Sequence, residues 1–349
     1  GMPTSLALVA EATPASSRKA MQGLRNVIFV FGSISGAAVV AVDSPDLTSL
    51  HWRWLLLLGA APSLLLGLAA AMFLRESPVF LAAAQRVGEA EGVLAEMRGL
   101  NGQPGVDVTV RPPLRPIVGA DAKARGWVSS RHFGIVFGRR RLFTTVALSM
   151  GCFVGNVVLW GHTYAFPMVA VQVHSSLPAA YQGLMQAVIG LGICFAAIAI
   201  ASCTTYRSLL LIGQFVGTVG PMSFVWAGAD MNKSAVKEAV FFVAQNCPGL
   251  CAACALFACF QLSTDLYPVE VSSTSASVVV VAGRLGAILG PLLFAVCGRW
   301  QSFYGLMASL SGAAAVMAAA LLPPEAAQME VQRAEEVEPL CAPPLDAKC

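Results

Sequence analysis

Charged residues are scarce in this chain. Asp, Glu, Lys and Arg together make up 12% of the 349 residues, whereas 56% are hydrophobic. Soluble domains carry about 25% charged residues, so this composition excludes a soluble globular protein and indicates a chain that lies in a membrane. The formal net charge is only +3. Such a small excess gives no electrostatic reason to expect a nucleic acid as a partner.

Residue combinations suited to catalysis or metal binding are also lacking. The sequence shows no nucleophile paired with a base and no Gly-rich phosphate loop. Eight of the ten cysteines lie in or beside apolar segments, without acidic or His partners: Cys152, Cys194, Cys203, Cys247, Cys251, Cys254, Cys259 and Cys297. A cysteine in this setting is typical of a small apolar packing residue. We therefore expect no metal, no cofactor and no enzymatic activity.

Long apolar runs, in contrast, are abundant. A helix needs about 20 apolar residues to cross a bilayer, and eight runs approach this length, near residues 21–42, 54–73, 142–171, 180–202, 208–228, 239–262, 275–297 and 303–322. They are rich in Ala, Leu, Val and Gly and do not alternate with polar residues, which favours helices over a transmembrane barrel. No Asp or Glu occurs inside these runs. The predicted fold class is an all-α polytopic membrane protein with eight full spans.

Basic residues are concentrated in one connecting segment. Residues 74–141 contain eleven of the 22 Lys and Arg residues. Cytoplasmic loops carry the excess of these residues in multi-pass proteins. This segment, and by alternation of the spans the C-terminus, are therefore predicted to be cytoplasmic. Arg53, Lys233, Lys237 and Arg299 fall on the opposite side.

These patterns divide the chain into four predicted regions. Residues 1–73 form the remainder of an N-terminal helical half, 74–141 an inter-half loop with a surface helix, 142–322 a six-helix C-terminal half, and 323–349 a disordered tail. Within the loop, Ser77 followed by Pro78 is typical of a helix start. Apolar residues spaced as far as Met97 predict one helix there.

The two halves share a sequence repeat. Five positions recur at an offset of 254 residues: Glu11, Pro14, Arg18, Gly32 and Gly36 correspond to Asp265, Pro268, Ser272, Gly286 and Gly290. Glycines four residues apart let neighbouring helices approach closely. Three long apolar runs precede the second copy, whereas ten residues precede the first. We therefore expect the chain to lack the front of its first half.

Several short motifs combine into a family resemblance. They are Glu11, Pro14 and Arg18, then Trp52-Arg53-Trp54-Leu55, Arg75-Glu76-Ser77-Pro78, Asp265-Leu266-Tyr267-Pro268-Val269-Glu270 and Gly283-Arg284-Leu285-Gly286. Together they resemble the signature of the major facilitator superfamily, in the branch of sugar porters, organic ion transporters and synaptic-vesicle-two-related proteins. The resemblance implies a partial fourth helix followed by the fifth to twelfth helices. It also implies alternating access between two helical halves.

The resemblance further implies a cytoplasmic latch of acid and arginine side chains at helix ends. Its members would be Glu11 and Arg18 in the first half, and Asp265, Glu270 and Arg207 in the second. Ser272 stands where the family usually has an arginine. The second half of the latch would therefore lack one partner.

Arg284 is the sharpest candidate for contact with a substrate. It lies ten residues into the apolar run 275–297, where a charge costs at least about 2.5 kcal/mol. We therefore expect it to face a cavity or a partner. Family members that move anions tend to carry Arg at the matching position, so the resemblance favours an anionic substrate. The alternative is that Arg284 pairs with Asp265 or with a backbone carbonyl.

Polar and aromatic side chains in three other spans are further candidates for the substrate path: Asn156, Trp160, Tyr164, Gln182, Gln186, Gln245 and Asn246. The first three are four residues apart and share one helix face, on a helix that the resemblance implies is broken. An aromatic belt is the alternative for Trp160 and Tyr164. Interhelical hydrogen bonding is the alternative for the amides. The lone His162 is expected to be hydrogen-bonded structure rather than a proton carrier.

The predicted function is secondary transport of a small organic solute, with an organic anion favoured. A sugar or organic cation porter and a non-transporting, inactive membrane paralogue are the alternatives. The expected partners are the lipid bilayer and the substrate, with or without a coupling ion. We expect the protein to be a monomer.

Overall fold

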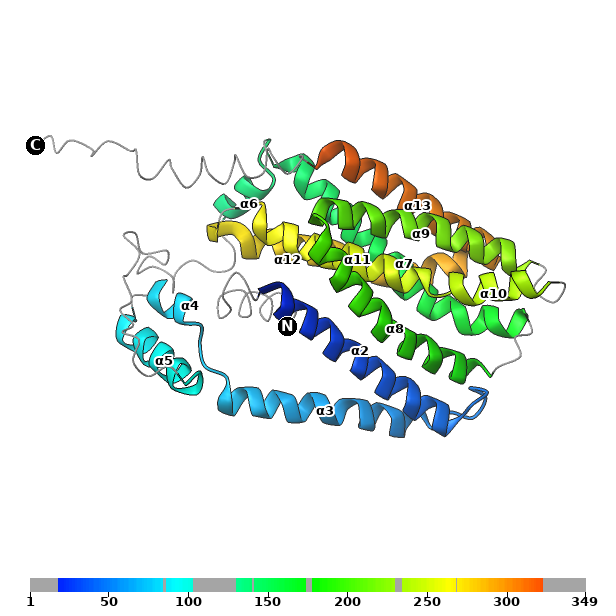
Figure 1. The fold of residues 1–349 in the computed structure, drawn as a ribbon, viewed down its shortest axis with the longest axis horizontal. Helices are drawn as coiled ribbons and strands as arrows, with labels where there is room; N and C mark the ends of the chain where they lie inside the picture. Colours follow the sequence, from blue (N-terminus) through cyan, green and yellow to red (C-terminus); the bar gives the residue numbers. More distant parts are fainter. Residues whose placement is uncertain are drawn as a thin grey trace, which may run out of the picture. The chain divides into compact units, whose positions relative to one another are not determined.

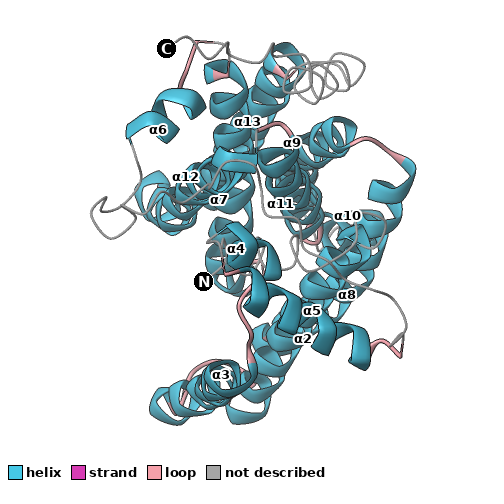
Figure 2. Cartoon of the chain, turned by 90° about the vertical axis from the view of Figure 1, so that its left-hand side faces the viewer, coloured by secondary structure: helices cyan, strands magenta, loops and turns pink. Residues whose placement is uncertain are grey.

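The computed structural model describes residues 18–83, 86–102, 130–139, 141–173, 178–229, 234–267 and 269–322. Within these ranges every regular element is a helix (Figures 1 and 2). The helices are α2 (Arg18–Asp43), α3 (Trp52–Phe73), α4 (Pro78–Ala83), α5 (Val87–Leu100), α6 (Ser130–Val136), α7 (Leu142–Gln172), α8 (Ala179–Cys203), α9 (Tyr206–Gly228), α10 (Ala235–Ala244), α11 (Cys247–Asp265), α12 (Val269–Cys297) and α13 (Trp300–Leu321).

Within the residues that the structure describes, eight helical segments are long and apolar enough to cross a membrane, which confirms the number of spans predicted from the sequence. Seven of these segments belong to single helices. The eighth, Ala235–Asp265, combines α10 and α11. The predicted all-α polytopic class is therefore correct.

The chain divides into two compact units. One comprises residues 1–134 and 165–198, and the other residues 135–164 and 199–349. We call them unit 1 and unit 2. The boundaries fall inside α6, α7 and α8. The four regions expected from the sequence, with limits at residues 73, 141 and 322, stay a prediction.

In unit 1, α2 is joined to α3 by a short loop that is fixed by one carboxylate. Asp43 accepts hydrogen bonds from the His51 backbone N–H at 2.8 Å and contacts the His51 ring at 2.9 Å. The α2–α3 loop also contacts α8, because the Ala180 N–H donates to the Pro45 carbonyl at 3.2 Å. No residue of α3 is buried. A helix that is apolar on all sides and unburied is suited to contact with lipid.

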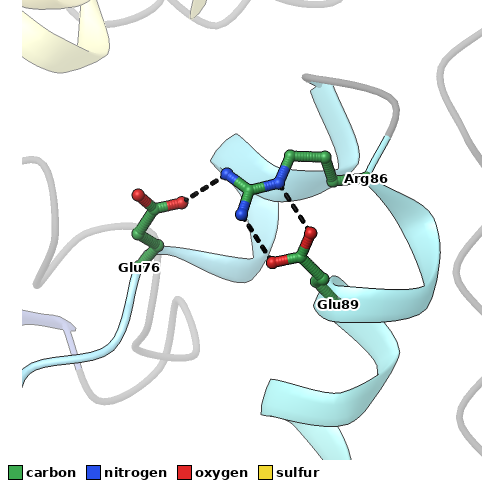
Figure 3. Close-up of polar contacts among 3 residues, drawn as sticks. All are labelled: Glu76, Arg86 and Glu89. Carbon is green, nitrogen blue, oxygen red and sulfur yellow. Dashed lines mark hydrogen bonds and ion pairs between the residues drawn. The ribbon is translucent and has the colours of Figure 1, made fainter.

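The connector contains two helices where the sequence predicted one. α4 ends at Ala83, and α5 begins at Val87. The Arg86 N–H donates back to the Leu81 carbonyl at 2.9 Å, while the Arg86 carbonyl accepts the first bond of α5. Figure 3 shows the Arg86 guanidinium between two carboxylates, paired with both oxygens of Glu89 and with Glu76 at 3.1 Å. These ion pairs link Arg86 to Glu76, before α4, and to Glu89, in α5, which simple helical periodicity does not encode.

Unit 2 is built around α9, which packs against α11 and α13 (Figure 1). The contact with α11 depends on small residues. A Cβ atom on Gly213 would lie 3.0 Å from the Cys251 carbonyl and from the Cys254 Cβ, and one on Gly220 would overlap the Cys247 Cβ. Glycine on α9 therefore makes room for cysteine on α11. This agrees with the sequence-based interpretation of these cysteines as packing residues.

A second close approach joins α12 to α7 within unit 2. A Cβ atom on Gly286 would overlap the Phe153 carbonyl oxygen, and one on Gly290 would lie 2.9 Å from the Gly161 backbone nitrogen. The backbones of the two helices are thus in contact at both positions. Gly286 and Gly290 are the glycines that the repeat placed at packing spacing. The predicted use of these two residues is confirmed.

Substitution of Gly286 by alanine is expected to destabilise unit 2. The added methyl group meets backbone rather than a movable side chain, and overpacking of this kind costs about 1–3 kcal/mol. Gly305→Ala is the matched control, because nothing lies within 4 Å of the Cβ position of Gly305 on α13. Thermal unfolding in detergent should show a lowered Tm for G286A alone. Equal Tm values for both variants would contradict the close approach of α7 and α12.

The α4–α5 turn is expected to loosen at acidic pH. The Arg86 hydrogen bond lowers the pKa of Glu89 below its ordinary value of 4.5, and Glu89 in turn raises the pKa of Arg86. Because the folded pKa of Glu89 is the lower one, its stabilising effect is complete above pH 4.5 and is lost as the pH falls through the folded value. Hydrogen exchange of residues 76–100, corrected for intrinsic rates, should report this loss.

The variant Glu89→Gln provides the control for this pH effect. It should exchange faster than the wild type at neutral pH and show little further change on acidification. Protection equal to that of the wild type in E89Q at neutral pH would show that the ion pair does not hold the turn.

Candidate functional site

The contact between α7 and α12 brings Asn156 close to Arg284. Asn156 is 8% exposed, and its Nδ2 donates to the Cys152 carbonyl at 2.9 Å. A Cβ atom on Gly283 would lie 2.7 Å from both Asn156 Nδ2 and Cys152 Sγ. Arg284 follows Gly283 directly, is exposed, and interacts electrostatically with Cys152. A buried amide and an intramembrane cation therefore lie around the same turn of α7.

Trp160 and Tyr164 continue the same side of α7, at intervals of four residues from Asn156. Their exposed fractions are 37% and 46%. The Tyr164 ring meets the Phe294 ring of α12 edge to face, with centroids 6.1 Å apart. Asn156, Trp160, Tyr164 and Arg284 thus lie along the α7–α12 pair. The two helices thus carry an amide, two aromatic rings and a guanidinium.

The predicted break in the seventh helix is not present. α7 runs as one helix of 31 residues with Pro167 inside it. Membrane helices tolerate an internal proline when hydroxyl side chains and small adjustments satisfy the freed carbonyls. The carbonyl that loses its helical donor to Pro167 is that of Thr163. The Thr163 hydroxyl donates to the Leu159 carbonyl at 2.8 Å, one turn further back. The resemblance overestimated the effect of this proline.

The interruption lies instead between α10 and α11, beside Gln245 and Asn246. Pro248 occupies the first turn of α11. Gln245 is 1% exposed, and Asn246 uses its Nδ2 to bond the Phe242 carbonyl at 2.8 Å. One donor of Asn246 is therefore committed to its own helix.

His162 joins this interruption to α13. Its Nδ1 lies 2.8 Å from the Tyr304 hydroxyl, and the ring also hydrogen-bonds to the Gln245 backbone. A neutral imidazole has one donor and one acceptor, so an Nε2–H that donates to the Gln245 carbonyl leaves Nδ1 to accept from Tyr304. Both side chains are 1% exposed or less. The expectation that His162 is hydrogen-bonded structure is confirmed.

Gln182 and Gln186 lie in α8, within unit 1. Gln182 is fully buried, and Gln186 is half-buried. The other substrate-path candidates, Asn156, Trp160, Tyr164, Gln245, Asn246 and Arg284, belong to unit 2. The structure thus gathers the candidates into two groups, one in each unit.

Two members of the predicted cytoplasmic latch are described with their partners. Asp265 accepts two hydrogen bonds from Gln261, each at 3.0 Å, and Arg207 donates to the Ala319 carbonyl near the end of α13 at 2.8 Å. Glu11 and the side chains of Arg18 and Glu270 lie outside the described residues. The latch as a whole stays a prediction.

A tyrosine contact that the sequence did not predict joins helix ends near Asp265. The Tyr267 hydroxyl lies 2.6 Å from Thr145 Oγ1, and the Arg141 guanidinium is 5.7 Å from the centre of the Tyr267 ring. Burial raises the pKa of Tyr267, so its hydroxyl stays protonated at neutral pH. Tyr267 belongs to the family motif Asp265-Leu266-Tyr267-Pro268, and this motif was the only sequence feature that pointed to the residue. Its partner Thr145 lies 122 residues away.

The comparisons with known proteins identify the class. Residues 2–334 match the family described as sugar (and other) transporter, and the chain belongs to that family. It is therefore a membrane transporter and not an enzyme.

Among solved structures, the chain is similar to the major facilitator superfamily proton:xylose symporter XylE bound to 6-bromo-6-deoxy-D-glucose. The TM-score is 0.65 at 18% sequence identity, and the match covers 91% of this chain and 67% of the symporter chain. This similarity shows the fold that was predicted. A comparison with curated proteins finds no significant match.

Loss of the His162 contacts is expected to destabilise the protein. His162→Leu removes the hydrogen bonds that His162 makes with the Tyr304 hydroxyl and the Gln245 carbonyl, both of which are buried. Each buried polar group that loses its hydrogen bond lowers the free energy of unfolding by about 1–3 kcal/mol. Tyr304→Phe should cost less, because it removes only one hydroxyl. Tyr164→Phe is the control, since Tyr164 is partly exposed. Unfolding in mixed detergent should rank H162L below Y304F and Y304F below Y164F. A wild-type stability of H162L would contradict a structural role.

Proposed function

We propose that the protein is a secondary transporter of a small organic solute, with an organic anion favoured, and that it works by alternating access between two helical halves. Membership of the transporter family supports the general activity. The positive charge of Arg284 is the observation that favours an organic anion as the substrate. The family consists of transporters rather than enzymes, and this excludes an enzymatic function.

Arg284 is costly where it lies. It is the sixteenth of the 29 residues of α12, about 22 Å along the helix at 1.5 Å per residue. A cation at such a depth faces a cavity, a polar partner or water. The arginine is exposed in unit 2, whereas its neighbour Gly283 is buried against α7. A guanidinium in this position can bind a carboxylate through two parallel hydrogen bonds.

Other side chains supply polar and aromatic contacts for such a solute. We infer that Asn156, Trp160 and Tyr164 line the path beside Arg284. Gln182, Gln186, Gln245 and Asn246 are proposed to contribute amides from the other helices. Transporter sites of this type lie near the bilayer midplane. Amide groups can donate hydrogen bonds to both hydroxyl and carboxylate oxygens.

A sugar is the second candidate substrate. It is supported by the description of the family and by the glucose derivative bound to the similar xylose symporter. The amide-rich set of candidate residues also suits a polyhydroxylated solute. An organic cation receives less support, since Arg284 would repel it.

The proposed arrangement places residues 74–141 and the C-terminus in the cytoplasm, because basic residues concentrate in that segment. The same orientation puts Glu11, Arg18, Asp265, Glu270 and Arg207 on the cytoplasmic side, where they would form the latch. The protein is proposed to act as a monomer, with or without a coupling ion.

Uptake by the purified protein in liposomes separates the substrate classes. Labelled aromatic or aliphatic carboxylates should be taken up, and Arg284→Ala should reduce this uptake at least tenfold, because a hydrogen bond to a charged group contributes about 1.5–3 kcal/mol. Arg284→Lys should retain part of the activity. Arg299→Ala is the control, since Arg299 is an exposed cation just before α13.

Three results would contradict the anion proposal. Uptake of hexoses or pentoses that carboxylates do not inhibit would favour a sugar. Unchanged carboxylate uptake in R284A would remove Arg284 from the site. Monodisperse protein that takes up neither class would support the non-transporting alternative.

A further inference from the structure

An apolar groove lies on the outer surface of unit 2, between α9 and α10. Its volume is about 370 Å³. Phe215 and Val219 of α9 and Val243 of α10 stand beside it, and they are 65%, 46% and 70% exposed. Small residues also line it, among them Gly220 and Ala239. The lining is therefore almost entirely apolar.

The shape of the groove follows from the packing already described. Gly220 sits directly on Cys247 at the start of α11, so no side chain projects from α9 at that point. α10 ends at Ala244 and is followed by the interruption at Asn246. The short α10 lies beside α9. The groove lies between these two helices.

A lysine of α10 contacts a tryptophan ring of α9 close to the groove. Lys237 of α10 precedes Ala239 by two residues, and Trp226 of α9 follows Ser223 by three. The Lys237 ammonium lies 5.4 Å from the centre of the Trp226 ring. Trp and Lys are the side chains that anchor helices at the level of lipid headgroups. Glu238 occupies the next position of α10 and is exposed.

We propose that this groove binds one phospholipid, with an acyl chain between α9 and α10 and the phosphate against Lys237. The chemistry of both parts fits. The groove offers apolar surface and small residues to the chain, and the Lys237 ammonium beside Trp226 offers a positive charge to the phosphate. Trp226 holds the ammonium in place through its ring. A bound lipid of this kind would be distinct from the solute path along α7 and α12.

The probe for this site is a phosphatidylglycerol with a photoactivatable group in one acyl chain. The full chain is reconstituted into nanodiscs that contain this lipid, irradiated and digested, and crosslinks are mapped by mass spectrometry. We expect crosslinks to concentrate in residues 215–247. Lys237→Gln should lower them about fivefold, the effect of one basic residue near a membrane surface. Ala239→Leu, which fills the groove, should lower them further.

Matched controls separate this site from general contact with the bilayer. Arg53→Gln removes a cation that lies 4.4 Å from the Trp52 ring on α3, a helix with no buried residue. Ala196→Leu enlarges another exposed alanine, on α8. Neither control should change crosslinking in residues 215–247. Crosslinks that persist in both K237Q and A239L would overturn the proposal. Crosslinks that fall equally in R53Q and A196L would also overturn it, and so would crosslinks between two copies of the chain through this face.

Discussion

The bilayer imposes the constraint on which the rest of this structure depends. Apolar side chains gain nothing by leaving lipid for the surface of another helix, so helices associate through close contact and shape. In unit 2 this contact is made by glycine. α9 presents Gly213, Gly217 and Gly220 to α11, and α12 presents Gly286 and Gly290 to α7. Each of these positions would clash if it carried even a methyl group.

Close backbone contact also determines where polar groups can lie. Asn156 is accommodated because Gly283 leaves space for its amide, and His162 is accommodated because the interruption at Pro248 provides a carbonyl. Both side chains therefore form hydrogen bonds with backbone carbonyl groups. Arg284 differs from them, because it lies on an exposed part of α12. That difference is why we propose a solute path along α7 and α12.

The sequence predicted the features that depend on local composition. Runs of about 20 apolar residues are sufficient to locate spanning helices. The four-residue spacing predicted a packing surface correctly at Gly286 and Gly290 but not at Gly32 and Gly36, where nothing lies within 4 Å of either Cβ position. Features that depend on distant partners were not predictable. Tyr304 lies 142 residues from His162, and Tyr267 lies 122 residues from Thr145. The division into α4 and α5 was missed because apolar spacing alone does not mark where a helix ends. The continuity of α7 through Pro167 was missed because a proline inside a membrane helix does not by itself end the helix.

The cysteines packed against these glycines have a consequence for experiments in solution. Cys152, Cys251, Cys254 and Cys259 are buried within unit 2, whereas Cys203 at the end of α8 is exposed. A thiol reagent added to the folded protein will therefore meet Cys203 readily and the four buried thiols only after helices separate. The number of thiols modified over time therefore reports the unfolding of the native chain.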